Sequence, residues 1–129
     1  MPVDASTLPL VGGHVALDLV NTVEPRLAAP SAGQARDHLT GPEALLTWAG
    51  RVNLVDAGEN AAVRAAWAAD PGAAGAALAA VEEIREALHT VLLAALDLIP
   101  GDAPPVRAAA DHLHTRRIAA LGRSALRLR

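Results

Sequence analysis

The chain has 129 residues, a formal net charge of −3 and no cysteine. This length predicts one domain with a single core, and the absence of thiols excludes a zinc site built on cysteine. The hydrophobic fraction of 52% overstates that core, because 31 of the residues counted in it are alanine. Trp48 and Trp67 are the only aromatic residues, so we expect stability to come from close helix packing.

No segment of the sequence is typical of a secreted or membrane protein. The N-terminus lacks a cationic stretch followed by a long apolar one, and no apolar run reaches the roughly 18 residues that a membrane span requires. The longest candidate, Val91 to Ile99, contains Asp97. We therefore expect a cytoplasmic protein that makes no membrane contact.

Helix-forming residues dominate the chain. Alanine and leucine favour helices. The sequence has no sustained period-two run of β-branched residues, which is the pattern that would indicate a large sheet. The sequence predicts an all-α fold, a single multihelical domain of about five helices spanning residues 1–129. We expect these helices at about His14 to Val23, Pro42 to Val52, Ala57 to Ala69, Ala73 to Ile99, and from Pro104 or Pro105 onward.

Capping residues mark several of the helix boundaries. Thr40 is a candidate N-cap for the second helix, with Glu43 placed as the acid of a capping box. Asp56 is a candidate cap for the third helix, and Asp70-Pro71-Gly72 is expected to break the chain before the longest one.

The longest predicted helix carries a regular apolar stripe and is expected to be the central strut of the domain. Its charged residues between positions 82 and 86, Arg85 among them, are expected to face solvent. The segment Val91 to Leu96 is apolar on every side, so we expect other helices to surround it. The stripe comprises Val81, Ile84, Leu88, Val91, Ala95 and Leu98, and the second helix has a shorter one of Leu45, Leu46, Ala49 and Val52.

An unusual run of polar residues interrupts the apolar pattern of the first helix, in the segment GGHVALDLVNTVEPR from Gly12 to Arg26. One interpretation is a pocket in which a carboxylate and an amide fix a small polar ligand. The other is internal: Asp18 pairs with Arg26 or Arg51, and Asn21 caps or bridges helix ends. The candidate ligand-binding residues are His14, Asp18, Asn21, Thr22 and Arg26.

The same segment resembles the start of the ABATE domain, which is found in bacterial proteins described as stress-induced transcription regulators and reads like GGxxALDFVNT followed by an arginine. Asp37 to Asp56 and Val81 to Leu96 resemble the family's second block and long helix, so the resemblance covers about residues 8–100. Residues 101–129 add a basic C-terminal helix and tail. The resemblance implies a sensory or regulatory N-terminal domain that binds a small-molecule effector or a protein partner.

Members of that family usually carry, after this domain, a zinc-binding module with a Cys-Gly-Asn-Arg motif. The resemblance implies that zinc and the main DNA contact belong to that module. Because this chain has no cysteine, we expect it to be a fragment, a shortened gene product or a stand-alone first domain, with no cofactor of its own. Any DNA contact is then expected only through an absent or weak C-terminal element.

The C-terminal end of the chain is basic, whereas the rest is acidic. Residues 1–105 carry a net charge of −8 and residues 106–129 a net charge of +5. One interpretation is a short arm that contacts phosphates; the other is a basic helix that packs on the acidic body and complements its own dipole. The candidate nucleic-acid residues are Arg116, Arg117, Arg123, Arg127 and Arg129.

Neither an enzyme nor a metal site is expected. His112 and His114 are two residues apart, which places them on different faces of a helix and does not suit shared metal binding. No serine lies in a nucleophile-elbow context, and no glycine-rich phosphate loop follows a strand.

A second functional hypothesis is a stand-alone protein-interaction module that forms a homodimer. It depends on apolar positions of the last helix and tail that have little else to cover them. These positions are Ile118, Leu121, Leu126 and Leu128.

Overall fold

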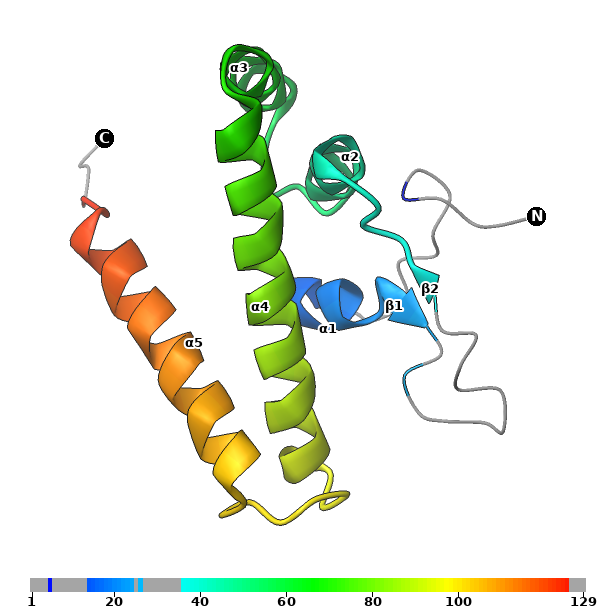
Figure 1. The fold of residues 1–129 in the computed structure, drawn as a ribbon, viewed down its shortest axis with the longest axis vertical. Coiled ribbons are helices and arrows are strands. Elements are labelled where there is room, and N and C mark those ends of the chain that lie inside the picture. The colour runs from blue at the N-terminus through cyan, green and yellow to red at the C-terminus, as the bar shows by residue number, and fades with distance from the viewer. Residues whose placement is uncertain (1–4, 6–13, 25, 27–35, 126–129) are drawn as a thin grey trace. The chain divides into compact units, whose positions relative to one another are not determined.

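The computed structural model describes residues 5, 14–24, 26 and 36–125. Figure 1 shows that helices dominate this part of the chain, which confirms the all-α prediction. A two-stranded antiparallel ribbon, in which Val23 pairs with Asp37, was not predicted. The elements are α1 Val15–Val20, β1 Val23–Glu24, β2 Arg36–Asp37, α2 Pro42–Arg51, α3 Ala57–Ala69, α4 Pro71–Ala95 and α5 Pro104–Gly122.

The chain divides into two compact units, Met1–Glu82 and Glu83–Arg129, and α4 contributes residues to both. A domain spanning residues 1–129 therefore stays a prediction. No described helix is both long enough and apolar enough to cross a membrane.

The core of the first unit is built around α2. Leu45, Leu46 and Ala49 are buried as predicted, and Trp48 is almost completely buried beside them, whereas Val52 is half-buried. The N-cap of α2 is Gly41 and not Thr40, so that prediction was wrong. Proline at the first helical position fixes the φ angle that starts the helix, and α2 begins at Pro42 without a side-chain cap.

Helix α3 begins with the predicted cap. The Asp56 carboxylate accepts a hydrogen bond from the Glu59 amide at 2.7 Å, and the Glu59 carboxylate accepts one from the Asp56 amide at 3.0 Å. This is a complete capping box. The box pairs backbone amides at the start of α3 that would otherwise lack a partner. Because no residue of α3 is fully buried, the helix depends more on such local bonds than on packing.

Helix α4 differs from its predicted bounds at both ends. It starts at Pro71. The Asp70 carboxylate accepts a hydrogen bond from the Ala73 amide at 3.1 Å and caps this start. It ends at Ala95 and not at Ile99, because Asp97 adopts a left-handed conformation with φ of 57°. The Leu98 amide then donates to the Leu93 carbonyl at 2.9 Å, the pattern of a Schellman motif.

The second unit consists of the later part of α4 and α5. Arg85 is only 4% exposed, so its predicted solvent position was wrong; its whole side chain is buried, and Nε pairs with Glu86 at 2.7 Å. The segment predicted to be surrounded by helices is half-buried or exposed, and Leu96 is 64% exposed. Among the described residues of this unit, α5 is the only other helix, and its buried residues are Val106 and Ala109.

Candidate functional site

Local hydrogen bonds shape both ends of α1, where the polar run of the sequence lies. His14 is the N-cap, and its Nδ1 accepts a hydrogen bond from the Ala16 amide at 3.0 Å. Asn21 is the C-cap, and its amide donates to the Leu17 carbonyl at 2.9 Å. These two residues therefore define a helix of six residues.

Thr22 and Arg26 bind the carbonyls that the end of α1 leaves open. Thr22 is completely buried, and its hydroxyl donates to the Leu19 carbonyl at 2.6 Å. Arg26 donates through Nε to the Val20 carbonyl at 3.0 Å. Because the last carbonyls of a helix have no partners within it, these bonds stabilise the helix end.

The two-stranded ribbon is hydrogen-bonded to the residues that follow α1. The Thr22 carbonyl accepts a hydrogen bond from the His38 amide at 2.7 Å, and His38 Nε2 lies 3.0 Å from Glu24 Oε1. The structure thus brings the five candidate residues together along α1, and four of them make hydrogen bonds at the two ends of this helix. Asp18 also has a partner within the chain. Ligand binding by this cluster stays a prediction.

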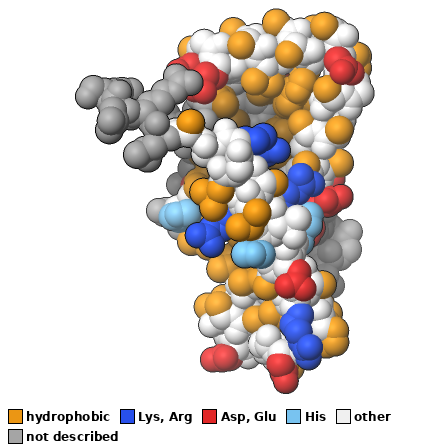
Figure 2. Space-filling model, turned by 90° about the vertical axis from the view of Figure 1, so that its left-hand side faces the viewer, with side chains coloured by type: hydrophobic (Ala, Val, Ile, Leu, Met, Phe, Trp, Pro, Cys, Tyr) orange, Lys and Arg blue, Asp and Glu red, His pale blue; other side chains and the backbone are white. Residues whose placement is uncertain are grey.

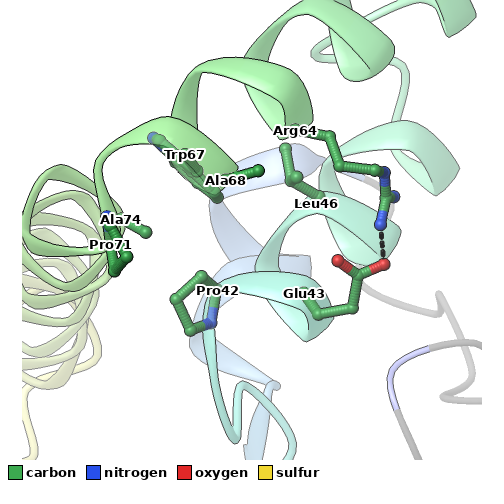
Figure 3. A pocket seen from close by; sticks show the side chains of 8 residues that line it. All are labelled: Pro42, Glu43, Leu46, Arg64, Trp67, Ala68, Pro71 and Ala74. Atoms are coloured by element: carbon green, nitrogen blue, oxygen red, sulfur yellow. Dashed lines mark hydrogen bonds and ion pairs between the residues drawn. The ribbon is translucent and has the colours of Figure 1, made fainter.

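A surface pocket of about 380 Å³ lies in the first unit, between α2, α3 and the first turn of α4. Figure 3 shows Trp67 and Ala68 reaching into it from α3, and Pro42 and Leu46 from α2. Its lining is mostly apolar. The lining residues are Pro42, Glu43, Leu46, Arg64, Trp67, Ala68, Pro71 and Ala74.

One edge of the pocket is charged. Arg64 Nη1 forms an ion pair with Glu43, drawn as the dashed line in Figure 3. Arg64 Nη2 also donates to Asn60 Oδ1 at 3.1 Å, and Asn60 Nδ2 donates to the Leu46 carbonyl at 3.0 Å. The guanidinium is therefore held by two groups, and one of them is anchored to the backbone of α2.

The sequence interpretation missed this pocket. It treated Glu43 only as a capping acid and Trp67 only as a packing residue, although Trp67 stays partly exposed. The available signal was a large aromatic residue on a helix whose other apolar residues are mainly alanine. Alanine side chains are too small to cover an indole ring.

Comparison with known families decides the affiliation. A sequence model of the ABATE family, described as "Putative stress-induced transcription regulator", matches residues 13–129. The chain belongs to the ABATE family. The match begins within the polar segment and extends through α5. Neither the curated proteins nor the solved structures contain a match to this ABATE chain.

In this ABATE chain the predicted basic residues of α5 differ in their surroundings. Arg116 Nη2 lies 3.7 Å from Glu83 on α4, which agrees with the packing interpretation, and His112 lies 3.8 Å from the same carboxylate. Arg117 and Arg123 are exposed. Figure 2 shows the arginine side chains on the face it presents as separate spots among hydrophobic and other surface. The predicted contacts of Arg127 and Arg129, and those of Leu126 and Leu128, lie outside the described residues.

Proposed function

We propose that this ABATE chain is the effector-binding regulatory domain of a transcription regulator, and that its effector binds in the pocket between α2, α3 and α4. The observation that carries the proposal is the pocket itself. Its volume of about 380 Å³ falls within the range of about 300–1,000 Å³ that is common for small-molecule sites. An apolar lining with a few polar groups at one edge is also typical of such sites.

The remaining parts of the proposal follow from the family and the composition. The family name supports a role in transcription, and the chain has no cysteine from which a thiolate zinc site could be built. We propose that the main DNA contact is made elsewhere, that the domain acts in the cytoplasm, and that it neither catalyses a reaction nor carries a cofactor.

Helix α4 is the proposed route from the pocket to the rest of the chain. Its first turn supplies Pro71 and Ala74 to the lining, and the same helix continues into the second unit. A ligand that binds better when this first turn is well ordered would stabilise α4 by the difference in affinity. The attached regulator would respond to that change.

A matched pair of substitutions tests the proposal. Ala66 and Ala68 are both exposed on α3, and of these two only Ala68 lines the pocket. Ala68→Leu should fill the pocket, whereas Ala66→Leu adds the same group to open surface. In a thermal-shift panel of cellular metabolites, at least one compound should raise the Tm of the unmutated chain and of Ala66→Leu, but not that of Ala68→Leu.

The same pair tests the regulatory part in the cell. Ala68→Leu should change the transcripts that loss of the gene changes, and Ala66→Leu should leave them as they are. A panel in which no compound distinguishes the two variants, together with identical transcripts, would refute the proposal.

Homodimerisation is the second candidate function. It is supported by Ile118 and Leu121 on α5, which are 53% and 56% exposed. Large apolar side chains on a helix surface favour association when they lie close together. Sedimentation should then show a mass that rises with concentration, and Ile118→Asp should abolish the rise. A strict monomer at high concentration would exclude this function.

A further inference from the structure

We infer that the pocket between α2, α3 and α4 takes a small aromatic carboxylate, with its ring against Trp67 and its carboxylate on Arg64. This inference rests on the proposed function, because it names the ligand class of the same site. It is carried by the pairing of a mostly apolar surface pocket with a guanidinium whose position does not depend on Glu43 alone.

The apolar part of the pocket suits a ring. Trp67 and Pro42 point into the same space from different helices, and Pro71 and Ala74 close the end farthest from the charged edge (Figure 3). Indole and proline rings offer flat faces, and an aromatic ligand gains from contact with the indole beyond its burial of apolar area. A pocket of about 380 Å³ has the size of a site for a small molecule.

The charged edge favours an anion over a cation. Asn60 holds the Arg64 guanidinium through its side-chain oxygen while its amide nitrogen is bonded to the Leu46 carbonyl. Arg64 therefore keeps one partner if Glu43 moves away. Planar guanidinium groups also match the geometry of a carboxylate, with two parallel donors.

Glu43 is a replaceable partner of Arg64. The side chains of Glu43 and Arg64 are 69% and 46% exposed, respectively, and an ion pair this open to solvent contributes little net stability. A ligand carboxylate can take the place of Glu43 at small cost. Since Glu43 also lies in the first turn of α2, its departure leaves a helix N-terminus that favours a negative charge nearby.

Three probes of similar shape separate the alternatives: 3-phenylpropionate, its neutral amide 3-phenylpropanamide, and the cation 3-phenylpropylamine. The readout is the indole N–H signal of Trp67 in nitrogen-15 NMR spectra. The chain has only two tryptophans, so Trp48→Phe identifies this signal. The carboxylate should bind at least tenfold more tightly than the amide, and the amine should bind most weakly.

Two charge-removing variants should act in opposite directions. Arg64→Gln should weaken 3-phenylpropionate at least tenfold and leave the amide within twofold. Glu43→Gln removes the competitor for Arg64 and should tighten the carboxylate several-fold. If the site is instead one for cations, Glu43→Gln weakens the amine and Arg64→Gln strengthens it, which would overturn the inference.

The outcomes also separate this inference from the proposed function. If the amide or the amine binds best, and Ala68→Leu abolishes that binding, the pocket remains the effector site and the carboxylate assignment is wrong. If no probe moves the Trp67 signal in any variant, the carboxylate assignment is also wrong, and the metabolite panel then decides the proposed function by itself.

Discussion

The hydroxyl of Thr22 is the feature of the polar segment whose energetic role can be measured most directly. Replacing it by Thr22→Val keeps the shape of the side chain and removes a buried bond of 2.6 Å to the Leu19 carbonyl. That carbonyl keeps a hydrogen bond from the Thr22 amide at 3.1 Å, so the loss should lie at the lower end of the range for an under-satisfied buried group, about 1–2 kcal/mol. For a chain of this size, this corresponds to a fall in Tm of about 4–8 °C.

Thr47→Val is the matched control for this substitution. The Thr47 hydroxyl also donates to a backbone carbonyl, that of Glu43 at 3.1 Å, but this bond is exposed to solvent. Water can replace it, so the control should change the free energy of unfolding by less than about 0.5 kcal/mol. Urea unfolding followed by circular dichroism measures both variants. Equal stability of the two variants would refute the structural explanation of Thr22. The interpretation of the polar segment as a ligand-binding site would then be favoured.

Three further predictions concern other parts of the chain. Asp56→Ala should cost about 1 kcal/mol of stability in urea unfolding, because it removes the capping box of a helix with no fully buried residue; an unchanged midpoint would contradict this. Trp48→Phe should keep the fold, since the indole N–H of Trp48 makes no hydrogen bond among the described residues, whereas Trp48→Ala should cost about 3–5 kcal/mol; equal Tm values for these two variants would argue against it. The exposed Arg117 and Arg123 should give at most weak, sequence-independent DNA binding, with Kd of about 10⁻⁴–10⁻⁶ M at physiological salt. Changing both to Gln should lower the salt slope by about two in fluorescence anisotropy, and strong preference for one DNA sequence would contradict this.

Local signals predicted the helices well where the chain supplies its own caps. Asp56 caps α3 as predicted, and the capping box that it forms with Glu59 was not predicted. Thr40 was wrong because α2 begins at Pro42, as predicted, and the residue directly before Pro42, which takes the cap position, is Gly41. The end of α4 failed because a stripe pattern does not show that Asp97 adopts a left-handed conformation.

Features that depend on contacts between distant residues were beyond the sequence. The ribbon joins strands of two residues each, 23–24 and 36–37, which are too short to give an alternating pattern. The burial of Arg85 depends on which parts of the chain pack against α4, which helical spacing alone does not reveal.

The two candidate sites illustrate the same limit. The polar segment stands out in the sequence by its composition, and the bonds of His14 and Thr22 account for part of that composition. The pocket was missed because Arg64 and Glu43 are 21 residues apart and meet only when α2 and α3 pack together. No local sequence pattern indicates the contact between these two side chains.

Amide mapping by NMR locates the effector site on the chain. Nitrogen-15-labelled chain is titrated with the small-molecule fraction of its own cell, and amide shifts are compared between the unmutated chain, Ala68→Leu and Ala66→Leu. We expect shifts centred on α2, α3 and the first turn of α4, present in Ala66→Leu and absent in Ala68→Leu. Shifts centred on residues 14–26, or shifts that persist in Ala68→Leu, would contradict the claim that the effector binds in this pocket.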